Sequence, residues 1–240
     1  MNKVKISILG GKTGYLGSYL TQELTKDENI ELIDLDYGLD YIINCMGYVD
    51  VGGCELNPSK SFNSNCGDFI KTCEEFKPKN IINMSSYFVY NKEKEVFNTN
   101  YARHKALADN YTVMKKGKNL LLGKLFGKSP NQQHRFPEMC LEEKVYAETT
   151  VHPFTRLSTV REAVNRIIYL EKHEEICIDF DSSAYVFANI VGKATVIKTP
   201  PMKSFKGYGN FVNCKYEDKG YSGVRKTMIQ EYVKEMECTV

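Results

Sequence analysis

The feature that most constrains this chain is a glycine-rich turn between a short apolar run and an amphipathic helix. The apolar run, Val4–Leu9, has the length and character of a buried strand. Residues 15–26 place apolar side chains at helical spacing. Between them the chain reads G-G-K-T-G-Y-L-G, with glycine at positions 11, 14 and 17. A strand, a turn with few side chains and a helix in this order predict the opening unit of a sheet covered by helices.

Apolar runs and helical patterns keep alternating after this unit. Strand-like runs lie at 30–35, 41–46, 80–85 and 119–126, and helical patterns lie at 58–76 and 99–115. The alternation predicts an α/β fold with a Rossmann-like, doubly wound parallel sheet. Residues 127–152 are polar and show no period. Beyond them we expect strands at 176–180 and 194–198 and helices at 159–173, 182–191 and 223–237.

One connection is shorter than this fold normally allows. Only five residues separate the apolar runs 30–35 and 41–46. A helical crossover between parallel strands takes roughly a dozen residues or more. Two interpretations follow: either 30–35 is a frayed edge, or a strand–helix unit of the ordinary sheet is missing.

Composition excludes several classes of function. The 240 residues carry 32 Lys and Arg against 30 Asp and Glu, so the net charge of +2 argues against a nucleic-acid partner bound through bulk charge. No run approaches the roughly 20 apolar residues of a membrane span, and the N-terminal apolar run is too short for a secretory signal. The eight cysteines show no metal-ligand spacing and are predicted to be thiols. We therefore expect a cytoplasmic protein without a metal site or a membrane partner.

The glycine turn predicts a dinucleotide site. Glycine at positions 11, 14 and 17 lets the backbone approach a pyrophosphate, and the helix that begins near Tyr15 directs its N–H groups at that charge. The alternative is a tight turn with close helix–sheet packing. We expect residues 1–126 to form a dinucleotide-binding core and residues 127–240 to complete the sheet and form a small C-terminal substrate lobe. The predicted contacts in the turn are Gly11, Lys12, Thr13, Gly14, Tyr15, Leu16 and Gly17.

The choice between NAD and NADP depends on charges around this turn. An acidic residue about 20 positions after it binds the adenosine ribose hydroxyls of NAD. Asp34 and Asp36 are the candidates, whereas Lys12 is placed to meet the 2′-phosphate of NADP. The prediction is NAD or NADP, with a slight preference for NAD.

A tyrosine and a lysine four residues apart are the candidate acid–base pair. The pattern Y-x-x-x-K occurs three times, at Tyr90/Lys94, Tyr101/Lys105 and Tyr111/Lys115. Only the middle pair opens a helix with small neighbours, since the first lies in a loop-like segment and the last ends in K-K-G-K. A tyrosine with a pKa of about 10 is a poor base at neutral pH, and a nearby ammonium lowers that pKa. Tyr101 is therefore predicted to transfer a proton and Lys105 to assist it.

Two strand ends supply further candidates. Ser86 closes the run 80–85, at the carboxyl edge where doubly wound sheets bind ligands, and its hydroxyl is placed to orient a carbonyl. Ser85 is the alternative. At the end of the run 41–46, Gly47 allows the cofactor to come close or serves only as a turn.

Four segments in order resemble the extended short-chain dehydrogenase/reductases: G-G-K-T-G-Y-L-G, Y-I-I-N-C-M-G, N-M-S-S-Y-F-V-Y and Y-A-R-H-K-A-L-A-D. The likeness is greatest to the dTDP-4-dehydrorhamnose reductases and nucleotide-sugar epimerases, in a shortened form. Tyr87-Phe88 replaces the acidic pair of the related dehydratases, which argues against dehydration. The resemblance implies a catalytic set of Ser86, Tyr101 and Lys105. It also implies cofactor contacts at the glycine turn, Cys45, Met46, Gly47, Asn65 and Lys105.

The expected function is reduction of a nucleotide-linked keto-sugar by NAD(P)H. An epimerase that recycles its own cofactor is one alternative. A regulator that binds NAD(P) without catalysis is another. The helix at 99–115 is a candidate surface for a homodimer.

Overall fold

The computed structural model describes residues 3–86, 89, 96–122, 124–126, 146–149, 155–159, 176–177, 180–182 and 196–199. The chain splits into two compact units, and each is described by itself. The described part of the first unit is residues 3–122 with their gaps and the strand at 176–177. The second contains the remaining described strands. The predicted helix at 223–237 lies outside the described residues, as do residues 183–191 of the one at 182–191 and residues 160–173 of the one at 159–173. The first residues of the last two, Ser182 and Thr159, each end a strand, so neither helix begins where it was predicted.

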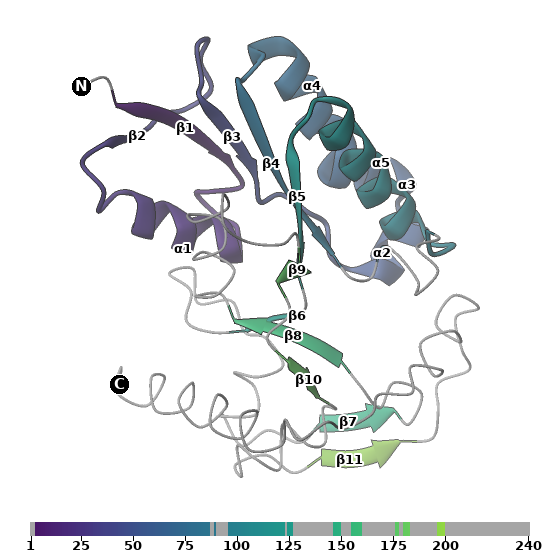
Figure 1. Cartoon of the computed structure of the whole chain (residues 1–240). Helices are drawn as coiled ribbons and strands as arrows, with labels where there is room; N and C mark the ends of the chain where they lie inside the picture. The colour runs from purple at the N-terminus through teal and green to yellow at the C-terminus, as the bar shows by residue number, and fades with distance from the viewer. Residues whose placement is uncertain are drawn as a thin grey trace. The chain divides into compact units, whose positions relative to one another are not determined.

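A six-stranded parallel sheet forms the centre of the first unit (Figure 1). Its strand order is β2-β1-β3-β4-β5-β9, which confirms the predicted α/β, Rossmann-like sheet. Every neighbouring pair in it is parallel. The strands are β1 (Val4–Leu9), β2 (Ile30–Leu32), β3 (Tyr41–Asn44), β4 (Asn80–Ser86), β5 (Lys118–Leu122) and β9 (Ile176–Cys177).

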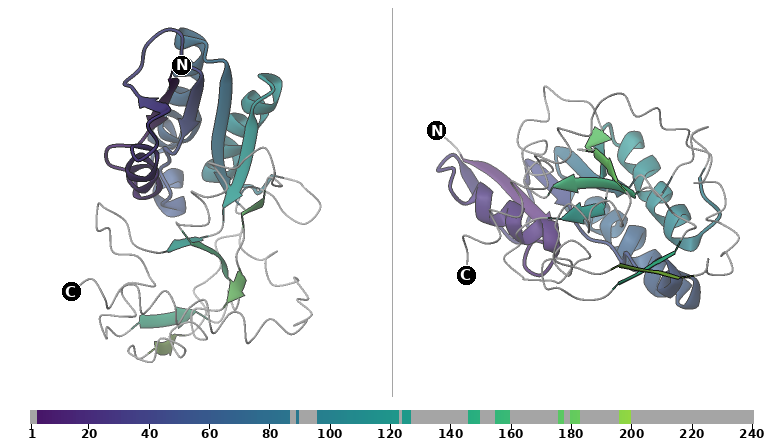
Figure 2. Two further views of the ribbon diagram at one scale, coloured as in Figure 1. Left: turned by 60° about the vertical axis from the view of Figure 1, so that its left-hand side comes forward. Right: turned by 90° about the horizontal axis from the view of Figure 1, so that it is seen from below.

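Helices connect most of these strands. From β1 the chain passes through α1 (Tyr15–Leu24) to β2, and from β3 and β4 it passes in the opposite direction through the later helices. Because such crossovers are right-handed, α1 covers one face of the sheet and α4 and α5 cover the other. Figure 2 gives two further views of this sheet, with α1 in purple beside the first strand. The later helices are α2 (Val51–Leu56), α3 (Pro58–Phe62), α4 (Asp68–Phe76) and α5 (Asn100–Met114).

The predicted helix at 58–76 is interrupted by a π-helical turn, η1 (Asn63–Gly67), between α3 and α4. The helix α2 was not predicted, because V-G-G-C-E-L contains two glycines and no helical period. The side chain of Asp50 caps α2 by accepting from Gly53 N at 3.0 Å. None of the helices in the described part of the chain is long and apolar enough to cross a membrane.

Residues 33–40 replace the helix that normally joins two parallel strands. β2 is only Ile30–Leu32, shorter than the predicted run. From the end of β2 the chain passes across β1 and enters β3 on its other side. Ile33 N donates to Ile6 O at 3.0 Å on one side of β1, and Asp40 N donates to Lys5 O at 2.9 Å on the other. Leu39 from this crossing is fully buried in a core cluster that includes Phe69 of α4. Both interpretations of the short connection therefore hold: the strand is short and a strand–helix unit is missing.

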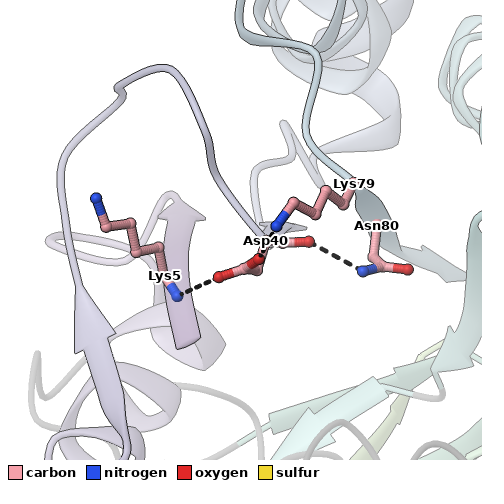
Figure 3. A network of polar contacts seen from close by, with 4 residues as sticks. All are labelled: Lys5, Asp40, Lys79 and Asn80. Atoms are coloured by element: carbon pink, nitrogen blue, oxygen red, sulfur yellow. Dashed lines mark hydrogen bonds and ion pairs between the residues drawn. The ribbon is translucent and has the colours of Figure 1, made fainter. Parts of the chain in front are cut away.

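Asp40 ties the starts of three strands together where this crossing ends (Figure 3). Its Oδ2 accepts from the backbone N–H of Lys5 at 2.8 Å, and its Oδ1 pairs with Lys79 Nζ at 2.7 Å. Its own carbonyl accepts from the Asn80 backbone N–H at 3.0 Å. These contacts join β1, β3 and β4 at the amino edge of the sheet.

Two predicted strands are each divided between the units. The run 119–126 becomes β5 in the parallel sheet and β6 (Lys124–Phe126) in a second sheet, and 176–180 divides between β9 and β10 (Phe180–Ser182) in the same way. In the second unit, β8 (Thr155–Thr159) pairs with β6 in parallel and with β10 antiparallel. β7 (Tyr146–Thr149) pairs in parallel with β11 (Val196–Thr199). The prediction of an irregular segment at 127–152 is therefore wrong at 146–149, and the domain boundary at 126/127 stays a prediction.

Candidate active site

The glycine turn and the segment after β3 lie against each other at the carboxyl edge of the sheet. Gly10 has a φ of +78°, and a Cβ built on it would lie 3.3 Å from the carbonyl carbon of Cys45 and from Met46 N. Cys45 N donates to Leu9 O at 3.0 Å. The strand order reverses between β1 and β3, which is where doubly wound sheets bind ligands. The structure thus brings together two groups of residues that the sequence predicted as cofactor contacts.

Close packing accounts for two of the glycines in the turn. A Cβ on Gly14 would lie 2.6 Å from Gly10 O, and a Cβ on Gly17 would lie 2.5 Å from the same oxygen. Such distances are too short for any side chain, so both positions require glycine whatever the turn binds. The tight-packing interpretation is therefore correct for these two residues.

The start of α1 also fits a pyrophosphate. Gly14 occupies the N-cap position without a side-chain hydrogen bond, and the first turn of α1 contains no acidic residue. A helix N-terminus without a side-chain cap presents backbone N–H groups and a partial positive charge to a bound anion. Dinucleotide binding by Gly11 to Gly17 stays a prediction that this geometry supports.

Lys12, the candidate contact for NADP, and Asp34, a candidate contact for NAD, form an ion pair. Lys12 Nζ lies 2.9 Å from Asp34 Oδ1, and both side chains are exposed. Asp36 instead bonds to the residue that follows it, because its Oδ1 accepts from Tyr37 N at 2.7 Å. Of the two acidic candidates, Asp34 is the one that lies beside the glycine turn.

Asn65 holds the segment after β3 in place. It lies in the π-helical turn, is buried, and binds both backbone groups of Tyr48. Its Oδ1 accepts from Tyr48 N at 2.9 Å, and its Nδ2 donates to Tyr48 O at 3.1 Å. A π-turn inside a helix is frequent at functional sites. The predicted cofactor contact of Asn65 is untested, and its amide already supports the loop that follows Gly47.

The predicted acid–base pair is buried on α5. Thr99 caps this helix by accepting from Ala102 N at 3.1 Å, which places Tyr101 and Lys105 in its first two turns. Tyr101 is 6% exposed and Lys105 is 3% exposed. Lys105 Nζ donates to Met84 O of β4, two residues before Ser86. Burial lowers the pKa of Lys105, and the charge of Asp109 opposes this shift.

The second Tyr–Lys pair on α5 has a structural role. Tyr111 donates from its hydroxyl to Glu74 at 2.9 Å, and Lys115 Nζ lies 2.8 Å from the same carboxylate. Burial, followed by the hydrogen bond to Glu74, raises the pKa of Tyr111, so its phenol is less suited to proton transfer. The pair at Tyr90/Lys94 lies outside the described residues.

The neighbouring serines of β4 differ in their surroundings. Ser85 is buried and its hydroxyl donates to Asp109 Oδ2 at 2.6 Å. Ser86 is the half-buried last residue of the strand. Because Ser85 is buried and Ser86 is half-buried at the carboxyl end of the strand, this geometry supports Ser86 as the hydroxyl that meets a ligand. The surroundings of Cys45 raise the pKa of its thiol to about 12, chiefly by excluding water, so it is not a nucleophile at neutral pH.

A row of asparagines beside the site escaped the sequence analysis. Asn44, Asn83 and Asn119 are paired neighbours on β3, β4 and β5, and all three are buried. Asn83 accepts from Asn44 Nδ2 at 2.8 Å and donates to Asn119 Oδ1 at 3.0 Å. It also donates to Asp109 Oδ1 at 2.9 Å. The available signal was an asparagine within each of three apolar runs, together with Asp109 four residues after Lys105.

The described residues contain no group of three or more His, Cys, Asp or Glu side chains placed to hold a metal ion. The four cysteines whose side chains are described, Cys45, Cys54, Cys66 and Cys73, are free thiols.

The chain shares its fold with a solved nucleotide-sugar reductase and a solved nucleotide-sugar epimerase. Comparison with solved structures gives dTDP-4-dehydrorhamnose reductase from Yersinia enterocolitica, with a TM-score of 0.75 and 16% identity over 97% of this chain and 99% of that one. UDP-glucose 4-epimerase from Thermotoga maritima, solved with UDP-glucose, gives a TM-score of 0.72 and 12% identity over 98% and 99%. At these identities the likeness establishes the fold.

Comparison of sequences gives a shorter match. Residues of this chain are 30% identical over 96 positions to a probable low-salt glycan biosynthesis reductase of Haloferax volcanii. The match spans 34% of this chain and 32% of that protein. No family model matches the chain.

Proposed function

We propose that this protein is an NAD(P)-dependent reductase that acts on a nucleotide-linked keto-sugar. The observation that carries the proposal is the placement of Tyr101 and Lys105 in the first two turns of α5, with Lys105 bonded to β4 just before Ser86. The glycine turn and Cys45 to Gly47 lie at the same edge of the sheet, at the point where its strand order reverses. The solved reductase and epimerase share this fold over nearly their whole length.

Each residue has a defined task in this reaction. The N-terminus of α1 and the glycine turn bind the pyrophosphate, and Lys105 holds the nicotinamide ribose. A bound nicotinamide supplies the hydride. Ser86 donates a hydrogen bond to the carbonyl oxygen, and Tyr101 gives that oxygen a proton, which completes the alcohol. The ammonium of Lys105 stabilises the phenolate that Tyr101 becomes.

Tyr101→Phe tests the proposal, because it removes one hydroxyl and keeps the ring. We expect turnover of a dTDP- or UDP-linked 4-keto-sugar to fall by roughly 100-fold or more, the usual contribution of a general acid, with the dissociation constant for NADH or NADPH unchanged. Tyr111→Phe is the matched control on the same helix and should keep full turnover. A Tyr101→Phe variant as active as the Tyr111→Phe variant contradicts the assignment.

Three activities on this fold are separated by what happens to the cofactor. A reductase oxidises one nicotinamide per sugar reduced, which the absorbance of the reduced cofactor follows directly. An epimerase converts the sugar with no net change in that absorbance, so its product must be detected by chromatography. A regulator binds the cofactor and converts no sugar. Net oxidation of the nicotinamide that depends on the sugar supports the reductase. Either of the other two results would replace the reductase assignment with the epimerase or the regulator.

The proposal also covers the assembly and location of the protein. The outer face of α5 exposes Leu107, Val113 and Met114, and this apolar face is our candidate for a homodimer contact. Light scattering during size-exclusion chromatography will show one mass or twice that mass. The free thiols among the described cysteines accord with the reducing cytoplasm in which we expect the protein to act.

A further inference from the structure

Asp109 is a buried carboxylate that the chemistry proposed above does not use. It is 4% exposed and lies on α5 one helical turn beyond Lys105 and two turns beyond Tyr101. A buried carboxylate destabilises a protein unless its oxygens are hydrogen-bonded or its charge is paired. Here Oδ2 accepts from the Ser85 hydroxyl at 2.6 Å and Oδ1 accepts from Asn83 Nδ2 at 2.9 Å. Both donors belong to β4, the strand that ends at Ser86.

These bonds attach α5 to consecutive residues of β4. Lys105 Nζ donates to the carbonyl of Met84, and Asp109 accepts from Ser85, the next residue. Asn119 of β5 adds a bond from its Nδ2 to the backbone carbonyl of Asp109 at 3.0 Å. The position of α5 along the strand is therefore fixed on both sides of the Lys105–Asp109 turn. Because Tyr101 is on the same helix, these bonds also determine where it lies relative to the end of β4.

We propose that Asp109 is a positioning residue of this site, which locks α5 in register with the end of β4 and supplies the negative charge that faces the buried ammonium of Lys105. The consequence for catalysis rests on the proposed function. The effect on Lys105 itself rests only on the arrangement of α5 and β4.

Lys105 requires a counter-charge because its surroundings exclude water. Loss of water lowers the pKa of Lys105, and the charge of Asp109 acts in the opposite direction. The other two groups that act on Lys105 are the thiols of Cys45 and Cys66. Burial raises the pKa of both thiols, so they carry no charge at neutral pH. Of these three groups, the carboxyl of Asp109 is the one whose ordinary pKa, about 3.9, lies below neutral pH.

The test follows the titration of the Lys105 side chain by NMR, with isotope-labelled lysine, in the full chain without cofactor or substrate. Asp109→Asn keeps the size of the side chain and an oxygen acceptor and removes the charge. Ser85→Ala removes the 2.6 Å hydrogen bond from the Ser85 hydroxyl to Asp109 and keeps the charge. We expect Asp109→Asn to lower the pKa of Lys105 by about 1 to 3 units, the usual effect of one close opposite charge, and Ser85→Ala to leave it in place.

Two results overturn the inference. One is a Lys105 titration that Asp109→Asn leaves unchanged, and the other is a shift in Ser85→Ala as large as that in Asp109→Asn. If Asp109→Asn does not fold, the titration of Lys105 in the unmodified protein decides: a side chain already neutral at pH 7 overturns the charge role, and a protonated one that remains so in Asp109→Glu supports it.

Activity provides a second readout that a purely structural role would not move. In the direction of reduction, the active form carries protons on both Tyr101 and Lys105. Removing the charge of Asp109 makes this pair lose its first proton at lower pH, so the alkaline limb of the kcat–pH profile should move toward acid in Asp109→Asn. An alkaline limb that lies at the same pH in Asp109→Asn as in the unmodified protein contradicts the inference. If no keto-sugar is turned over, the proposed function fails while the titration still decides the role of Asp109.

Discussion

Replacing Asn83 with alanine should destabilise the first unit more than any other single change to a polar side chain of β4. Asn83 is fully buried and makes three side-chain hydrogen bonds, to Asn44, Asn119 and Asp109. Alanine removes all three, and Asn44 Nδ2, Asn119 Oδ1 and Asp109 Oδ1 each lose the bond that Asn83 makes to them. Two bonds between neutral groups at about 1 kcal/mol each and one to a carboxylate at about 2 kcal/mol predict a loss of about 4 kcal/mol in the free energy of unfolding.

The same strand supplies the matched control. Asn80 is exposed, and its Nδ2 donates to Asp40 O at 3.1 Å (Figure 3). Surface substitutions away from special features usually change the free energy of unfolding by about 0.5 kcal/mol or less, and we expect Asn80→Ala to do the same. Since residue type and strand are identical, the comparison of the two variants measures what burial and the additional hydrogen bonds of Asn83 contribute.

The measurement is urea unfolding of the full chain, followed by far-ultraviolet circular dichroism because the chain contains no tryptophan. Amide hydrogen exchange in β4 and β5 then assigns the loss to this unit. A free energy of Asn83→Ala within about 1 kcal/mol of that of Asn80→Ala would refute the reasoning, because it would mean that the asparagine row contributes no more than surface bonds.

Three further predictions test the packing of the glycine turn, the preference between NADH and NADPH, and the contacts of Asp40. Gly17→Ala should destabilise by about 1 to 3 kcal/mol in thermal or urea unfolding, because its Cβ would lie 2.5 Å from Gly10 O. Gly52→Ala in α2, where the nearest atom is at 3.6 Å, should be neutral or stabilising, and equal losses in both would contradict this. Asp34→Ala should improve NADPH binding relative to NADH by about tenfold, measured as a ratio of dissociation constants, because it frees Lys12 and removes a repelling carboxylate. The same gain in Asp36→Ala would disprove a special role for Asp34. The hydrogen bond from Lys79, then that from the Lys5 N–H, lowers the pKa of Asp40 below its ordinary 3.8. Its stabilisation is therefore complete above that value and is lost as pH falls through the lowered folded-state pKa. The difference in melting temperature between the natural protein and Asp40→Asn should accordingly shrink in acid, and a constant difference would exclude the carboxylate as its source.

The core of the fold could be predicted because its signals are local. Strand and helix periods over Val4–Leu9, 15–26 and 99–115 lie within short windows of sequence, and the structure has elements at each of them. Spacing along one helix likewise placed Tyr101 and Lys105 on adjacent turns before any tertiary contact was known. The divided strands at 119–126 and 176–180 could not be predicted, because the sheet with which each half pairs is set by segments distant in the sequence.

The sequence by itself determined a strand–glycine turn–helix unit, a parallel sheet, and three Tyr–Lys pairs of equal spacing. Only the tertiary structure distinguished the two described pairs, because the surroundings of Tyr111 are set by Glu74 on another helix and those of Lys105 by Met84 on a strand. It also showed that Ser85 is buried and donates to Asp109, a carboxylate that the sequence analysis did not single out. Spacing decides which side chains share a face of one element. Burial, partners and charge depend on what the rest of the chain places against that face.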